Sequence, residues 1–393
     1  MPNRSIQNQL QKLSNQVKGV LRLAIDRLAL LSLDNPSKLN KQVCIIRLDA
    51  LGDFVAWLPV AEILCSYYGE RNIKTILIAN ENWSQFASDL NLFSEIISVN
   101  RNLYVNNLFY RFKINSQIKK YTFSLVLNPV YNREFYLSDS LNRVTKSTRK
   151  IGFICNETDS RHKKISDKWY TDLIRKEEVL QHNILLGYAF LDYLEIGYPH
   201  KAIGSKRLFE LLENSRGTIG EGPYYVIVPG SGWAGRSWPI EKWAKLCQLI
   251  SKESKMKGIV LGSKAEISLG SNISSVNKMI INLVGKTSIK EMAEVISKAN
   301  FIISNETSAI HLAIQLNIPS ICILGGGHYG QFLPIPAGIQ IKTPPILVNH
   351  LLPCYGCNWQ CPYQYSPTDS VKCISNIDVD GVFNILKSNF VLN

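Results

Sequence analysis

The stretch Val43-Cys-Ile-Ile-Arg-Leu-Asp-Ala-Leu-Gly-Asp53 decides the fold that we expect for this chain. Its opening residues, up to Leu48, form a strand-like apolar run of the kind that is buried in a parallel sheet. A tight turn with Asp49 and Gly52 follows, and we expect a helix to begin near Asp53. A strand, a glycine-containing turn and a helix in this order form the repeating unit of doubly wound α/β domains.

The rest of the chain repeats this alternation of short apolar runs and helical stretches. We expect strands at 74–79, 94–99, 123–128, 150–154, 224–228, 258–262, 279–283, 300–303 and 319–324. We expect helices at 53–68, 106–119, 181–195, 239–254, 288–298 and 306–316. The polar, glycine-rich stretch 213–223 is the best linker, so we expect two α/β domains, at 41–215 and 216–393, after an N-terminal segment at 1–40.

Composition excludes a disordered or collagen-like chain, because 46% of the 393 residues are hydrophobic and 19% are charged. The net charge of +13 indicates an anionic partner, such as a nucleotide, a phospholipid, a lipopolysaccharide core or a nucleic acid. Basic and aromatic residues are mixed between Arg101 and Lys176, but no recognised nucleic-acid motif accompanies them. An anionic acceptor or a membrane surface is therefore favoured over nucleic acid.

Residues 4–33 have apolar positions at helical spacing with Lys and Arg interleaved, which predicts a basic amphipathic helix. Two interpretations stay open: a helix in a membrane interface, or a helix packed on the domain or on a second subunit. No run of about 18 apolar residues predicts a spanning helix, and the N-terminus does not resemble a secretory signal. Because the nine cysteines are odd in number and several lie in apolar runs, we expect a cytoplasmic protein. With the basic amphipathic helix, we expect this protein to be peripheral at the inner face of the cell membrane.

Asp53 carries the first chemical hypothesis. It is expected at the carboxyl end of a parallel strand, where open α/β sheets bind their ligands. A partly desolvated carboxylate there could act as a general base, because burial raises its pKa. The alternative is an ordinary helix cap.

The segment 225–243 repeats the order of strand, glycine-rich loop and helix. Backbone N–H groups at Gly230, Ser231 and Gly232 can cradle a phosphate, and Arg236 can offer a forked donor to a diphosphate. This is not a P-loop, because the Gly-Lys-Ser/Thr ending is absent.

The segment 301–313 leads from a buried strand to Asn305 and Glu306 and then to a helix start. The Glu306 carboxylate can accept hydrogen bonds from sugar hydroxyls, while Thr307 and Ser308 can donate to phosphate oxygens. His311 falls on the first turns. The alternative is a helix with a Ser/Thr cap and a packed histidine.

Four motifs in this order resemble glycosyltransferase family 9, the lipopolysaccharide heptosyltransferases. They are Ile45-Ile-Arg-Leu-Asp-Ala-Leu-Gly-Asp53, the Pro229–Pro239 segment, Leu283-Val-Gly-Lys-Thr-Ser-Ile-Lys-Glu291 and Asn305-Glu-Thr-Ser-Ala-Ile-His-Leu-Ala313. The resemblance covers about 43–70 and 224–375, and residues 100–215 are much less diagnostic.

The resemblance implies a GT-B fold, in which two Rossmann-like domains face a central cleft, with no cofactor needed at the transfer centre. The family moves a sugar, often from ADP-heptose, to a lipopolysaccharide-type acceptor with inversion. By analogy Asp53 is the general base, with Asp49 and Gly52 on the acceptor side. The residues expected to bind donor and nucleotide are Gly230, Ser231, Arg236, Glu266, Thr287, Glu306, Thr307, Ser308 and His311.

Two positions depart from the family pattern. Glu306 stands where the family usually has Asp, and Ser308 stands where it usually has Gly. Either change is consistent with a different donor sugar, so ADP-heptose stays a hypothesis.

A cysteine group near the C-terminus, within 354–373, has the spacing of a metal site. Four thiolates, Cys354, Cys357, Cys361 and Cys373, can form a tetrahedral structural zinc site, and iron is an alternative. The other interpretation is a cluster of free or disulfide-linked cysteines.

Two further functions stay open at this stage. One is a GT-B nucleotide-sugar epimerase or hydrolase, which acts on its donor without an acceptor. The other is a non-enzymatic basic protein that binds membranes or nucleic acid. An inverting glycosyltransferase is the leading hypothesis.

Overall fold

The computed structural model describes residues 4–31, 41–154, 160–175, 182–213, 219 and 222–391. These residues form two compact units that are discontinuous along the chain. The first unit comprises described residues of Met1–Ala50, Ile63–Leu180 and Ala189–Gly197, and the second comprises those of Leu51–Glu62, Gln181–Tyr188 and Tyr198–Asn393. Much of the expected linker 213–223 lies outside the described residues, so the boundary near residue 215 stays a prediction.

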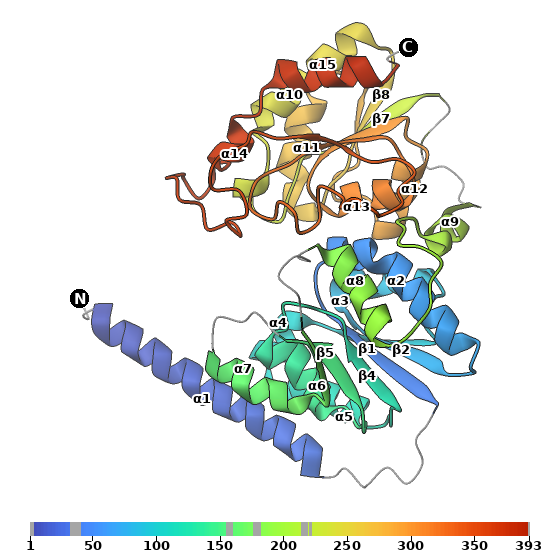
Figure 1. The fold of residues 1–393 in the computed structure, drawn as a ribbon. Helices are drawn as coiled ribbons and strands as arrows, with labels where there is room; N and C mark the ends of the chain where they lie inside the picture. Colours follow the sequence, from blue (N-terminus) through green and yellow to red (C-terminus); the bar gives the residue numbers. More distant parts are fainter. Residues whose placement is uncertain are drawn as a thin grey trace. The chain divides into compact units, whose positions relative to one another are not determined.

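The first unit contains a parallel six-stranded sheet in the order β3-β2-β1-β4-β5-β6 (Figure 1). Its strands are β1 (Gln42–Arg47), β2 (Lys74–Asn80), β3 (Glu95–Val99), β4 (Leu125–Asn128), β5 (Lys150–Phe153) and β6 (Asp172–Ile174). The helices of this unit are α1 (Arg4–Leu31), α3 (Glu81–Asp89), α4 (Arg101–Asn106), α5 (Leu108–Ile118), η1 (Phe135–Asp139), α6 (Ser140–Val144), α7 (Ser160–Ser166) and η2 (Asp167–Trp169). Two more helices, α2 (Leu51–Gly69) and α8 (Asn183–Tyr193), contribute residues to both units.

The second unit repeats this topology with the strand order β12-β11-β10-β7-β8-β9. Its strands are β7 (Tyr224–Val228), β8 (Lys257–Val260), β9 (Ile280–Asn282), β10 (Phe301–Asn305), β11 (Ser320–Ile323) and β12 (Ile346–Val348). Its helices are α9 (Lys206–Glu213), η3 (Ala234–Arg236), α10 (Ile240–Glu253), η4 (Lys264–Glu266), α11 (Ile267–Ser274), α12 (Ile289–Ser297), α13 (Ser308–Gln315), α14 (Lys372–Ser375) and α15 (Val379–Asn389). Both sheets therefore have the Rossmann order, in which the chain changes direction beside the first strand.

The strands form because short runs of branched apolar residues are buried on both faces of each sheet. All five residues of β7 and all five of β10 are buried. Helices cover the two faces, so that Trp243 and Leu246 of α10 and Val382 of α15 join the strands in one core. Burial of every residue along a strand distinguishes a parallel sheet, covered on both faces, from an antiparallel sheet with one solvent-exposed face.

The expected α/β class with two doubly wound sheets is confirmed, but several details of the elements are corrected. The short edge strands β6 and β12 were not predicted, because three residues carry too little periodicity to be recognised. The expected helix 106–119 corresponds to α5 and begins two residues later, because Asn107 is its N-cap and accepts a hydrogen bond from the Tyr110 N–H; residue 106 ends the separate helix α4, which was not predicted. No helix among the described residues combines the length and apolarity needed to cross a bilayer.

The start of α2 is also corrected. Ala50 is the N-cap, in extended backbone, and the helix begins at Leu51. Gly52 and Asp53 therefore lie within the first turn, so Asp53 neither starts nor caps the helix. A carboxylate in the first turn still interacts favourably with the positive end of the helix dipole.

Helix α1 is joined to the first unit through a buried ion pair. Arg111 of α5 donates to both carboxylate oxygens of Asp26, at 2.8 and 2.7 Å, and Asn115 adds a third hydrogen bond at 2.9 Å. Both charged side chains are fully buried. Breaking such a pair is costly, because the remaining charge has no water to solvate it.

We expect Asp26→Ala to lower the free energy of unfolding by about 3–5 kcal/mol, because the Arg111 guanidinium is left buried without its carboxylate. Urea denaturation followed by circular dichroism measures this loss. Arg27→Ala, at the exposed next position of the same helix, is the control and should change stability little. Equal effects of the two substitutions would contradict the anchoring role of Asp26.

Candidate functional site

The candidate site lies where β7 and β10 are neighbours in the second sheet. Ser304 pairs with Val228, so the two strands end at the same level. Strand order reverses at this pair, and ligands of open α/β sheets bind outside the carboxyl ends of strands at such a switch point. The loops that leave these ends carry Gly230, Ser231 and Arg236 on one side and Glu306 on the other.

Asn305 ties the two loops together, a role that the sequence analysis missed. Its side-chain amide donates to the backbone oxygen of Pro229 at 2.6 Å. Its side-chain oxygen accepts from the Trp238 N–H at 3.0 Å. An amide at a strand end that faces a second glycine loop is the only sequence signal for this role.

Arg236 bridges the same two loops. Its Nη2 donates to the backbone oxygen of Glu306 at 2.8 Å, and its guanidinium carbon lies 5.1 Å from the Trp359 ring centre. The stacked ring and the hydrogen bond fix the direction of the guanidinium, which suits it to binding a diphosphate.

Glu306 is a buried carboxylate without a hydrogen-bond partner among the described residues. Its side chain is 5% exposed, and both carboxylate oxygens lack a donor in the described part of the chain. Burial raises the pKa of Glu306 to about 7; Arg236 opposes this rise and Asp53 adds to it. The site therefore contains an acceptor that the described part of the protein leaves unsatisfied, as expected for a ligand-binding carboxylate.

Asp53 belongs to the same compact unit and is held by Asn183, which the sequence analysis did not identify. Asn183 Nδ2 donates to Asp53 Oδ1 at 3.2 Å. The Asn183 N–H donates to Gln331 O at 2.7 Å, and His182 Nε2 donates to Phe332 O at 2.6 Å. The polar pair His182-Asn183 at the head of the apolar helix α8 was the available signal.

Gly52 has a packing role that differs from the expected turn. A Cβ at this position would lie 3.3 Å from His311 Cδ2 and 3.6 Å from the Ser308 Cα. Gly52 thus lets the first turn of α2 pass close to the first turn of α13. His311 is buried, and burial with the nearby His182 and Arg236 charges lowers the pKa of His311 to about 4, so the imidazole is neutral at pH 7.

Two hydroxyls of these loops, those of Ser231 and Thr307, make local hydrogen bonds. Ser231 Oγ donates to Trp233 O at 2.6 Å, and Thr307 is the N-cap of α13, where its Oγ1 accepts from the Ala309 N–H at 3.4 Å. Ser308 is the first residue of that helix. The backbone N–H groups at the start of α13 are further donors that could bind an anion.

Glu266 lies across Gly230. A Cβ on Gly230 would come within 1.8 Å of Glu266 Oε1, so only glycine permits this packing. The other oxygen, Oε2, accepts from the Ser263 N–H at 2.6 Å and from its hydroxyl at 2.8 Å. The Glu266 carboxylate thus caps η4 and also lies against the glycine-rich loop at Gly230.

The remaining expected residues are Asp49 and Thr287. Asp49 belongs to the first unit and forms an ion pair with Arg47 at 2.8 Å. Thr287 is half-buried in the turn that leads to α12, one residue before the N-cap Ser288.

The three glycines 325–327, which follow β11, do not present bare backbone. A Cβ at Gly326 would meet the Tyr355 ring at 2.6 Å, and a Cβ at Gly327 would meet the Trp359 ring at 2.1 Å. Because glycine has no side chain, the aromatic rings of Tyr355 and Trp359 pack directly on this stretch of backbone.

The cysteines Cys354, Cys357, Cys361 and Cys373 are free and lie near one another. Burial raises the pKa of the Cys373 thiol, and the other three cysteines raise it further. Within the described ranges, however, no three His, Cys, Asp or Glu side chains are arranged as a metal centre. The expected tetrahedral geometry is therefore not preformed, although the ligands are gathered.

Comparison with known proteins agrees with the fold and with the family that the motifs resemble. The profile of glycosyltransferase family 9 (heptosyltransferase) matches residues 111–341, more than half of the chain. The lipopolysaccharide core heptosyltransferase OpsX of Haemophilus influenzae is 25% identical over 296 residues, which cover 72% of this chain and 78% of that protein. The solved structure of the E. coli heptosyltransferase WaaC with ADP-2-deoxy-2-fluoro heptose has a TM-score of 0.66 at 16% identity, covering 88% of this chain and 99% of that chain.

Two Rossmann-like sheets in this order, together with the similarity to the solved heptosyltransferase structure, thus define a fold of the GT-B class. The chain belongs to glycosyltransferase family 9 (heptosyltransferase), and the resemblance inferred from its motifs is confirmed.

The raised pKa of Glu306 predicts a pH-dependent stability. Between about pH 4.5 and 7 the unfolded chain releases the Glu306 proton while the folded chain keeps it, so folding is favoured at low pH and less so as the pH rises. We expect wild type to lose up to about 3 kcal/mol of unfolding free energy relative to Glu306→Gln across this range. Urea denaturation at several pH values measures the difference.

The comparison with Glu306→Gln cancels the opposite contribution of His182 and His311, which both proteins share. Glu213→Gln, at an exposed carboxylate, is the matched control and should follow wild type. Parallel pH curves for wild type and Glu306→Gln would show that Glu306 titrates at its ordinary pKa.

Proposed function

We propose that this protein is an inverting heptosyltransferase that moves heptose from an ADP-linked donor to a lipopolysaccharide core or related cell-surface glycan. Family membership supports sugar transfer. The donor and acceptor are suggested by OpsX, named for the lipopolysaccharide core, and by WaaC, solved with an ADP-heptose analogue. The observation that carries the proposal is the buried Glu306 carboxylate, which finds no donor among the described residues and whose pKa responds to the charges of Arg236 and Asp53.

In the proposed reaction Asp53 is the general base. It takes the proton of an acceptor hydroxyl, whose oxygen forms a bond to the anomeric carbon of the donor. The bond from that carbon to the diphosphate oxygen breaks on the opposite face, and its electron pair leaves with ADP. Asn183 is a positioning residue, because its hydrogen bond to Oδ1 orients the carboxylate toward the acceptor.

The leaving diphosphate gains negative charge as this bond breaks. Arg236 and the backbone N–H groups at Ser231, Thr307 and Ser308 would stabilise that charge, because they are fixed before the reaction begins. Because Gly230 has no side chain, the diphosphate could approach the loop backbone closely at this position. The donors thus act without reorganising around the product.

The remaining residues would bind the donor and the acceptor. Glu306 would accept hydrogen bonds from hydroxyls of the donor sugar, which would supply the donors that its oxygens lack among the described residues. We place Glu266 and Thr287 beside the nucleotide, His311 as a neutral side chain behind the donor, and Asp49 and Gly52 on the acceptor side.

The test separates the base from the diphosphate contact. Asp53→Asn should lower turnover by a factor of at least about 100 while ADP affinity stays unchanged, because only proton transfer is lost. Arg236→Ala should weaken ADP binding about 10-fold or more and lower turnover as well, because a charged hydrogen-bonding partner is removed. Isothermal titration with ADP and a transfer assay with ADP-heptose measure the two effects.

Arg207→Ala, at an exposed arginine of α9, is the control and should alter neither quantity. Full turnover of Asp53→Asn would remove Asp53 from catalysis. Rapid conversion of the donor sugar without any acceptor, followed by NMR, would instead favour an epimerase or hydrolase. Absence of any affinity for nucleotide sugars would favour a non-enzymatic binding protein.

We also propose that Cys354, Cys357, Cys361 and Cys373 hold a structural zinc or iron ion. The mutual influence of their thiols indicates proximity, and tetrahedral thiolate ligation suits either metal. The ion would fix the C-terminal segment that covers the glycines 325–327 and places Trp359 against Arg236.

Protein purified without chelator should contain about one zinc or iron ion per chain by mass spectrometry, as a tetrathiolate site would hold. Cys357→Ser should lose the metal and lower thermal stability, while Cys65→Ser, a cysteine outside the group, should keep the metal. Metal-free wild type with unchanged stability after metal addition would refute the site.

We propose finally that the protein acts as a peripheral protein at the cytoplasmic face of the inner membrane. An acceptor built on a glycolipid would be found there. The net charge of +13 suits a surface that is rich in anionic headgroups.

A further inference from the structure

Helix α1 binds the first unit through its polar side, which is unusual for an amphipathic helix. Asp26 lies in the ion pair with Arg111, and Arg22 Nε donates to Val105 O at 2.6 Å. Gly19 is buried against Tyr136, whose hydroxyl would lie 2.5 Å from an added Cβ. These three residues share one face, because they follow one another at helical spacing.

The opposite face of α1 is apolar and exposed. Val17, Val20, Leu21 and Leu28 have 52%, 66%, 44% and 56% of their surface exposed. At 3.6 residues per turn these positions form one stripe on the side of the helix away from Asp26. Lys18 and Arg27, both exposed, flank the stripe on its two sides.

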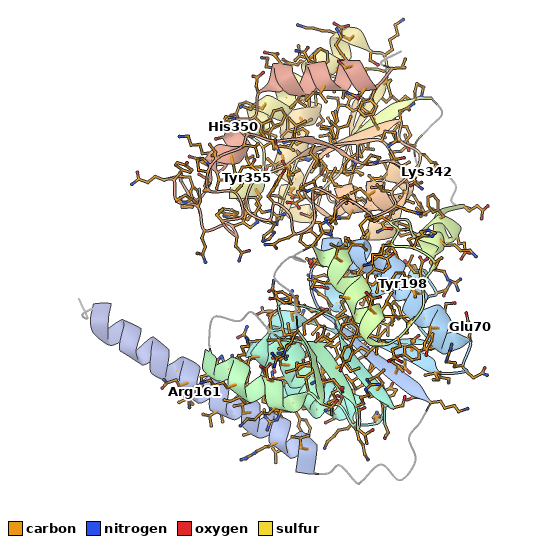
Figure 2. All side chains as sticks on the ribbon, viewed as in Figure 1. Glu70, Arg161, Tyr198, Lys342, His350 and Tyr355 are labelled. Carbon is orange, nitrogen blue, oxygen red and sulfur yellow. The ribbon has the colours of Figure 1, made fainter. Side chains whose placement is uncertain are left out.

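Helix α7 extends this surface with further cations. Tyr136 links the two helices, because its ring lies 4.9 Å from the Arg22 guanidinium of α1 and 5.3 Å from the His162 ring of α7. Arg161 and Lys164 of α7 are exposed, as is Ile165 at 37%. Figure 2 labels Arg161 on α7.

Positive charges also lie close together near Arg27, toward the C-terminal end of the apolar stripe. Burial lowers the pKa of Arg143 in α6, and the positive charges of Arg27 and Arg111 lower it further while Asp26 opposes them. Neighbouring α5 exposes Phe109 and Phe112, at 79% and 48%. Clustered cations beside exposed apolar side chains favour an anionic, partly apolar partner.

We propose that the outward face of α1, extended by α7, binds the surface of an anionic phospholipid bilayer. The apolar stripe would enter the boundary between headgroups and acyl chains, and the flanking cations would contact lipid phosphates. Asp26 is the only acidic residue of α1 and it is buried, so the exposed face offers no carboxylate to a basic partner.

A second copy of this chain fits the face less well than lipid. In a symmetric dimer the same patch meets itself, which would bring Lys18 and Arg27 close to cations of identical patches. Anionic headgroups neutralise these charges instead. The inference rests on the proposed location at the membrane, and it adds the surface that makes the contact.

The experiment measures co-sedimentation of the full chain with phosphatidylcholine vesicles, with and without phosphatidylglycerol. Wild type should bind the anionic vesicles at least about tenfold more tightly than the neutral ones. Val17→Ser/Val20→Ser/Leu28→Ser and Lys18→Gln/Arg27→Gln should each weaken anionic binding about tenfold or more. Met279→Ser, at a 42% exposed apolar residue of the second unit, is the control and should bind like wild type.

Circular dichroism and the urea midpoint must match wild type, which exposed positions allow. Binding that ignores the anionic lipid, or that survives both α1 variants, would overturn the proposal. So would a wild-type dimer that the serine variant converts to monomer, with no vesicle binding by either form. Transfer to a water-soluble acceptor should be unchanged in the α1 variants, whereas loss of transfer with vesicle binding intact would count against the proposed reaction alone.

Discussion

The candidate site depends on one constraint, which is that the loops after β7 and β10 stay joined. The Asn305 side chain meets this constraint by donating to Pro229 O at 2.6 Å and accepting from the Trp238 N–H at 3.0 Å. Buried hydrogen bonds of this kind are costly to break, because each partner would be left without water. Arg236 and Glu306 are therefore fixed in place before a ligand arrives, and fixed donors stabilise developing charge without reorganisation.

The same region gathers groups that lower the stability of the folded chain. Glu306 is buried with a pKa of about 7, and His182 and His311 are buried with pKa values of about 4, each because burial disfavours the charged form. Hydrogen bonds fix His182 and Asn183, whereas the Glu306 oxygens have no described donor. His182 and Asn183 therefore support the structure of the site, whereas Glu306 is suited to binding a ligand.

Helix α1 shows why periodicity alone does not tell which face of a helix is buried. The apolar stripe through Val17, Val20 and Leu28 would ordinarily be assigned to the core. In the structure the ion pair between Asp26 and Arg111 holds the opposite face instead. The reason is electrostatic: a paired, fully hydrogen-bonded carboxylate can be buried, and once it is buried the helix has only one orientation.

The sequence by itself determined the α/β class, the Rossmann-like sheets and the family, because buried strands and ordered glycine loops leave strong local signals. The motif residues Arg236 and Glu306 were found in this way. Asn183, Asn305 and the packing of Gly52 on α13 were not, since each depends on segments that are distant in sequence. The family match also covers residues 111–215, where local motifs are weakest. Only the tertiary structure decided these contacts and the outward face of α1, because hydrogen bonds and burial between remote segments leave no periodic trace in a single sequence.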